Sequence, residues 1–243
     1  LSSAASDVYK RQIGDYAFLN CAGLKSLALH DAVRQWGGGA LMNCRSLNTF
    51  RLTRLGEEGD TLAYFADELS RELDVTIYET DGQTVHLIFP EFVEAYEENC
   101  PAHHFDYNIS GAGYPYHHCF VRRRLDLRTY DRLWKAFLGM EHEPDCALRL
   151  AFWRLRYPLD LTPEAAEDYL DYLRCQAEKA LVWLIGERDA AHLRFLLERV
   201  KPGAAYSLAS SSSRVVLRMV ILQRFILWDR LFFVKICKVA GKS

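Results

Sequence analysis

Residues 13–52 read IGDYAFLNCAGLKSLALHDAVRQWGGGALMNCRSLNTFRL and contain one unit written twice, at an offset of 23 residues. A fixed repeat period in this range is typical of solenoids, in which each unit buries its apolar face only by stacking on a neighbour. The repeat therefore predicts an architecture and says little about chemistry. Seven pairs of positions match: Gly14 and Gly37, Ala17 and Ala40, Asn20 and Asn43, Cys21 and Cys44, Leu24 and Leu47, Leu27 and Phe50, and Leu29 and Leu52.

Each copy ends in a short stretch with alternating apolar residues, which predicts a β-strand. Leu27 and Leu29 in the first copy, and Phe50 and Leu52 in the second, should point inward. Solenoids often bind partners through the opposite face of such strands, so we expect a candidate protein-binding face there, although a solvated sheet surface has the same pattern. This face comprises Ser26, Ala28, His30, Thr49, Arg51 and Thr53.

The first copy, from Ile13 to Leu29, resembles a BspA-type leucine-rich repeat, whose pattern is roughly I-G-x-x-A-F-x-x-C-x-x-L-x-x-I-x-I. The second copy departs from that pattern where Trp36-Gly-Gly-Gly-Ala-Leu41 replaces its first six positions. The helical remainder of the chain is similar to the C-terminal part of some leucine-rich repeat proteins from gut Firmicutes. The resemblance implies a bacterial repeat protein that binds another protein and needs no cofactor.

The two ends of the chain differ in composition from the rest. Residues 1–12 resemble a translated sequencing adapter, so we predict a non-native leader and a native start part-way through a repeat array. Residues 204–243 form a serine-rich linker followed by a basic, apolar tail. Three interpretations of this tail stay open: a buried helix pair, a partner-binding segment, or sequence translated outside the true reading frame. We prefer the last.

Charge and cysteine content exclude several classes of protein. The 243-residue chain has a formal net charge of -2, and because residues 214–243 carry +6, residues 1–213 carry -8. A mildly acidic body argues against a nucleic-acid partner, and no uncharged run in the tail approaches the roughly 20 residues that span a membrane. Seven scattered cysteines are not a disulfide framework and favour a reducing compartment such as the cytoplasm. The oligomeric state does not follow from the sequence.

Beyond the repeats, local signals predict a helix over residues 61–73 and then a β-hairpin. Asp81-Gly82 between two β-branched runs is a strong hairpin signal, and this hairpin would close the open edge of the repeat sheet. Residues 91–125 have no clear period and predict an irregular connector. The fold class is therefore α+β, with leucine-rich repeats and a hairpin cap in residues 13–90.

From residue 126 the apolar period becomes helical and predicts a domain of antiparallel, solenoid-like helices over residues 126–203. Asp126 and Asp145 are candidate N-caps, and the helix that begins near Asp145 must end by Tyr157 because Pro158 follows. Thr162-Pro163-Glu164 predicts the start of a helix that runs to about residue 185. A last helix should extend from Asp189 to Val200.

Histidine and cysteine concentrate in residues 100–119, which raises an alternative function. The cluster comprises Cys100, His103, His104, His117, His118 and Cys119. These side chains are the usual zinc ligands, but their spacing differs from that of known zinc motifs. No catalytic motif is present in the sequence, so we expect a non-catalytic protein-interaction protein with no metal. The alternative is a metal-binding and hydrolytic protein that uses this cluster.

Overall fold

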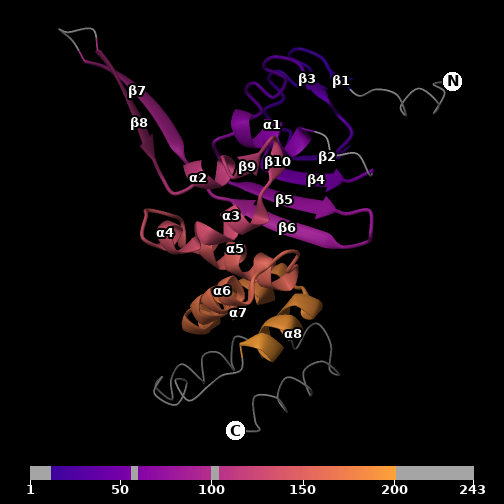
Figure 1. Ribbon diagram of the computed structural model, residues 1–243, viewed down its shortest axis with the longest axis vertical. Helices are drawn as coiled ribbons and strands as arrows, with labels where there is room; N and C mark the ends of the chain where they lie inside the picture. The colour runs from indigo at the N-terminus through magenta and orange to yellow at the C-terminus, as the bar shows by residue number, and fades with distance from the viewer. Residues whose placement is uncertain (1–11, 56–59, 100–103, 201–243) are drawn as a thin grey trace, which may run out of the picture. The chain divides into compact units, whose positions relative to one another are not determined.

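The structure, a computed structural model, describes residues 12–55, 60–99 and 104–200 (Figure 1). The predicted leader up to residue 11 and the predicted linker and tail at 204–243 therefore lie outside the described residues. The chain divides into two compact units, Leu1–Tyr169 and Leu170–Ser243. Strands dominate up to residue 125 and helices follow, so the predicted α+β class is confirmed.

A four-stranded sheet lies at the centre of the first unit. Its strands follow the order β2 (Ser26–His30), β4 (Thr49–Thr53), β5 (Leu73–Tyr78) and β6 (Thr84–Phe89). The first three strands run parallel, whereas β6 returns antiparallel to β5, which confirms the predicted hairpin. Its turn is closed by Asp81, whose carboxylate accepts the Gln83 N–H, and Gly82 there has a φ of +83°.

The two sequence copies lie beside each other, and their lateral pairing follows the repeat period. Ser26 in β2 pairs with Thr49 in β4, and the short strand β1 (Gln12–Ile13) pairs with β3 (Gln35–Trp36), both at the sequence offset of 23. Between these strands, Asn43 Nδ2 donates to Asn20 Oδ1 over 2.8 Å. Both asparagines have a φ near +60°, so the copies repeat the same left-handed turn.

Apolar side chains on the inner face of the sheet pack beneath helix α1 (Thr61–Glu68). The ring of Phe65 lies 4.0 Å from that of Phe50, and the inward residues of β4, β5 and β6 are buried. Leu27 and Leu29 also point inward but are only half-buried, because β2 is an edge strand. The predicted helix was too long: Leu69 is already extended, and Leu73 starts β5 in the sheet core.

The prediction of an irregular connector over residues 91–125 was wrong. Two long strands, β7 (Val93–Asn99) and β8 (His104–Ser110), form an antiparallel hairpin there. A short helix, α2 (Tyr114–His117), and two short paired strands, β9 (Phe120–Val121) and β10 (Arg124–Leu125), follow. In β7, adjacent acidic residues interrupt the apolar alternation, so there is little strand signal in that segment. In β8, Phe105, Tyr107 and Ile109 alternate with polar residues, a strand signal that the sequence prediction missed.

Helices α3 (Leu127–Arg132), α4 (Trp134–Leu138) and α5 (Pro144–Arg156) belong to the same unit as the sheet. Asp126 caps α3 as predicted, since its carboxylate accepts the N–H groups of Arg128 and Thr129. Asp145 was wrongly predicted as a cap: it lies inside the first turn of α5, because Pro144 already occupies the start of that helix. The helix ends before Tyr157, as predicted.

The remaining helices are α6 (Pro163–Cys175), α7 (Ala177–Glu187) and α8 (Ala190–Arg199). The predicted single helix to residue 185 is divided, because the backbone leaves the helical conformation at Gln176. The last helix has the predicted bounds, and the structure adds that Asp189 caps its start. Within the described residues, no helix combines the length and hydropathy that a membrane crossing requires.

Candidate functional site

The six residues of the predicted protein-binding face lie together on the outer face of the sheet. The register pairs them laterally as Ser26 with Thr49, Ala28 with Arg51, and His30 with Thr53. Their neighbours Phe50 and Leu52 are buried on the opposite face, so the alternation predicted from the sequence holds in both strands. Of the six, all but the two threonines of β4 are exposed.

The same face continues across β5 and β6. Arg51 is paired with Thr76, which in turn is paired with His86, and the next row places Tyr78 beside Thr53. Tyr78 is an exposed aromatic side chain, so it adds an apolar contact to an otherwise polar row. The hairpin signal would have placed these residues on this face, although the sequence prediction stopped at β4.

Helix α5 borders this face along β6. The indole of Trp153 stacks on the His86 imidazole with ring centroids 3.9 Å apart, and Nε2 of His86 lies 2.8 Å from an Asp74 carboxylate oxygen. At the same border, Arg149 contacts both carboxylate oxygens of Glu72 at 2.7 Å. The outer face is therefore open over β2 and β4, whereas α5 covers it over β6. No local sequence pattern predicts that Trp153 forms a wall at this border.

Ion pairs fix the ends of the parallel strands next to this face. Arg54 follows β4, and its guanidinium reaches Asp31 after β2 and Glu79 after β5. Asp31 is buried, and its backbone N–H donates to Thr53 O at 2.9 Å. One cation thus joins three adjacent strand ends, which restricts relative movement of the rows that carry the exposed residues.

His117, His118 and Cys119 are not arranged as metal ligands. Both ring nitrogens of buried His117 contact backbone oxygens, Nδ1 at 3.0 Å from Ala66 O and Nε2 at 2.9 Å from Pro90 O. Burial lowers the pKa of His117 to about 4, although the two carbonyl oxygens act in the opposite direction.

The neighbouring members of this cluster are also engaged locally. Cys119 donates its S–H to Tyr116 O, and burial raises the pKa of this thiol. His118 is exposed, and its Nδ1 contacts Tyr114 O. Across the described parts of the chain, no group of three potential ligands converges on a metal position. Cys100, His103 and the side chain of His104 lie outside the described part of the structure.

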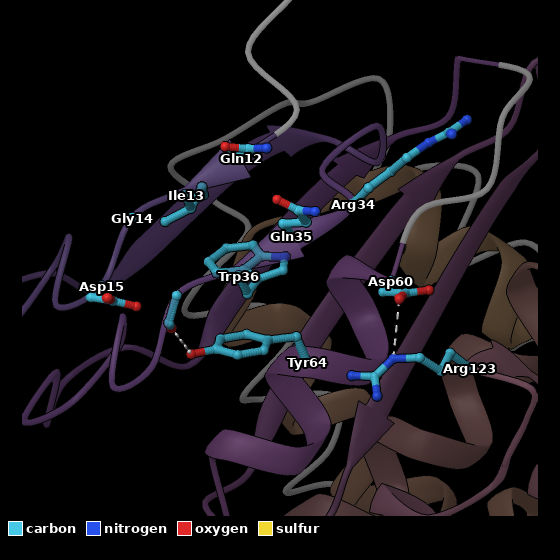
Figure 2. A pocket seen from close by; sticks show the side chains of 11 residues that line it. Gln12, Ile13, Gly14, Asp15, Arg34, Gln35, Trp36, Asp60, Tyr64 and Arg123 are labelled. Atoms are coloured by element: carbon cyan, nitrogen blue, oxygen red, sulfur yellow. Dashed lines mark hydrogen bonds and ion pairs between the residues drawn. The ribbon is translucent and has the colours of Figure 1, made fainter.

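A cleft of about 710 Å³ opens between the β1–β3 pair and the start of α1 (Figure 2). Trp36 and Tyr64 form its aromatic wall, stacked with ring centroids 4.5 Å apart. Tyr64 donates its hydroxyl hydrogen to Gly37 O at 3.2 Å. Burial, with the charge of Glu68, raises the pKa of Tyr64 to about 12, so this hydroxyl stays protonated at neutral pH.

The charged groups of this cleft are engaged in structural contacts. Asp60 forms an ion pair with Arg123 at 3.2 Å, and Asp15 accepts the Gly38 N–H at 2.8 Å. The described lining residues include no serine, threonine, cysteine or histidine that could act as a nucleophile or proton carrier. The groups that line the cleft are therefore the aromatic wall, these two carboxylates and polar side chains.

No protein-family model, curated protein or solved structure matches this chain.

Proposed function

We propose that this chain is a non-catalytic protein-binding module that contacts another protein through the outer face of β2 and β4. The observation that carries the proposal is the lateral pairing of six surface residues in three rows beside the Trp153 wall. Such a surface offers hydroxyl and imidazole groups for hydrogen bonds, an arginine and an adjacent exposed tyrosine, and both arginine and tyrosine are enriched in interface hot spots.

We further propose that residues 12–53 are two coils of a leucine-rich-repeat solenoid. The proposal is supported by the common offset of 23 in both strand pairs and by the Asn20–Asn43 hydrogen bond. The second copy departs from the repeat pattern at Trp36, and there the indole stacks on Tyr64 of α1, so the departure has a packing role. The solenoid-like character of the helical segment stays a prediction.

The experiment tests the face with the full-length chain and a charge-reversal variant. Arg51→Glu changes an exposed residue in the middle row of the face, and Arg128→Glu makes the same change on an exposed position of α3. Proteins retained by the immobilised wild type are identified by mass spectrometry, and the affinity of a purified candidate for each variant is then measured by calorimetry.

The proposal expects Arg51→Glu to weaken binding at least about tenfold, as for an interface arginine, and Arg128→Glu to leave it unchanged. A partner that binds both variants as tightly as the wild type would place its site elsewhere. Equal losses in both variants would indicate a general charge effect and would also count against the face.

A further inference from the structure

The β7–β8 hairpin is a second exposed surface in the first unit. Its two strands pair only with each other among the described residues, and Figure 1 shows them extending away from the four-stranded sheet. The base is held firmly, since Phe92 N–H donates to Ser70 O at 2.8 Å and Gly113 N–H donates to Glu91 O at 3.1 Å. A two-stranded ribbon is marginally stable in water, and a third strand stabilises it.

One face of this hairpin presents aromatic and apolar side chains to solvent. Tyr96 and Tyr107 are directly opposite each other, with ring centroids 4.8 Å apart, and Tyr96 is 70% exposed. Glu94 and Ile109 form the next pair on this face and are also exposed. The Tyr107 hydroxyl donates to Glu94 Oε1 at 2.6 Å, which holds the carboxylate on this face.

The sequence of the hairpin region is acidic. Residues 91–121 contain five acidic residues and no lysine or arginine, and three of the five acidic residues belong to β7: Glu94, Glu97 and Glu98. The same hairpin of a second copy would place carboxylates against carboxylates, which is unfavourable for neighbouring strands. A basic extended segment has the complementary charge, and β7 is the more acidic edge.

We propose that the free edge of β7 accepts an extended segment of a partner protein, with lysine or arginine at alternate positions, as a third strand. Backbone hydrogen bonds along the edge supply affinity in such strand addition, and alternate side chains supply specificity. Alternate basic side chains fall on the face of Glu94 and Tyr96, where they meet a carboxylate and an exposed aromatic ring. This site is separate from the outer face of β2 and β4 and does not depend on it.

The test uses full-length protein and synthetic fluorescent peptides, with binding measured by anisotropy. The probe is a seven-residue peptide of alternating arginine and valine, and the matched peptide has glutamate in place of arginine. A third peptide has the arginine–valine sequence with alternate backbone nitrogens methylated, which removes hydrogen bonds along one edge. The protein variants are Glu94→Lys, at an exposed position of β7, and Glu141→Lys as the control, which makes the same charge reversal at an exposed position between α4 and α5.

Of the three peptides, only the unmethylated arginine–valine peptide should bind, and its affinity should fall roughly tenfold in Glu94→Lys and stay unchanged in Glu141→Lys. Methylation of the peptide backbone should abolish the binding. Equal binding of the methylated peptide would show attraction between charges without strand addition, and would overturn the proposal, as would absence of binding by the arginine peptide. Self-association of the wild type that Glu94→Lys abolishes would assign the edge to a second copy and would equally overturn it.

Discussion

Replacing Arg154 by methionine should lower the free energy of unfolding by about 3–5 kcal/mol, the range for breaking one side of a buried ion pair. The Arg154 side chain is fully buried. Its Nε and Nη2 each donate to Asp131 at 2.8 Å, and the same guanidinium donates to Tyr157 O and Leu159 O at 3.2 and 3.1 Å. Methionine preserves much of the side-chain length but leaves buried Asp131 with the hydrogen bond from Tyr169 and without its cation.

The assay is urea unfolding of the full-length chain, followed by circular dichroism and tryptophan fluorescence. The matched control combines Arg154→Met with Asp131→Leu and Tyr169→Phe. It removes both charges of the ion pair, and also the Tyr169 hydroxyl, which would otherwise lose the Asp131 carboxylate as its acceptor. We expect this triple variant to recover most of the lost stability, because a buried ion pair contributes little net over apolar replacements. A loss below about 1 kcal/mol for Arg154→Met would match a surface pair and would refute the reasoning.

Three further predictions concern His117, Gly37 and Asp126. Burial lowers the pKa of His117 from 6.5 to about 4, so its contribution to the free energy of unfolding is complete above pH 6.5 and is lost as the pH falls towards 4. His117→Gln should therefore remove roughly 3 kcal/mol from the pH dependence of the free energy of unfolding, measured by urea unfolding. An unchanged pH profile would contradict this. Gly37→Ala should cost about 1–3 kcal/mol, since a Cβ there overlaps the backbone of the first copy. The repeat-equivalent Gly14→Ala has open space and should change the melting temperature little, and equal effects of the two would exclude this explanation. Asp126→Ala should cost about 1 kcal/mol by loss of an N-cap, whereas Glu143→Ala, at a helix start without a side-chain cap, should not; equal losses would argue against capping.

Local signals in the sequence predicted the turns and helix starts whose backbone conformation or capping requires one or two particular residue types. Asp81-Gly82 specified the β5–β6 turn, Asp126 forms the cap expected of it, and Asp189 begins the last helix as expected. The alternation in residues 26–30 and 49–53 placed the outer face correctly, because strand side chains point to opposite sides at successive positions. These predictions needed no knowledge of distant contacts.

Features that depend on distant contacts were missed. Arg154 belongs to a charged type that is usually solvated, and the carboxylate that neutralises it in the core comes from Asp131, 23 residues earlier. The cleft wall joins Trp36 to Tyr64, and no local period relates them. The break at Gln176 has no glycine or proline near it, so no local signal in the sequence ends the helix there.

The antiparallel return of β6 limits where this architecture can gain length by gene duplication. A 23-residue segment copied in frame between β2 and β4 would supply a parallel strand, its own asparagine and matching turns to both neighbours. The same segment inserted after β5 would separate the two strands of a tight hairpin and displace the helix that covers β6. Among relatives of this chain, we therefore expect differences in length to be multiples of 23 residues on the β2 side of β5, with the outer face widening while the hairpin and its helix stay constant.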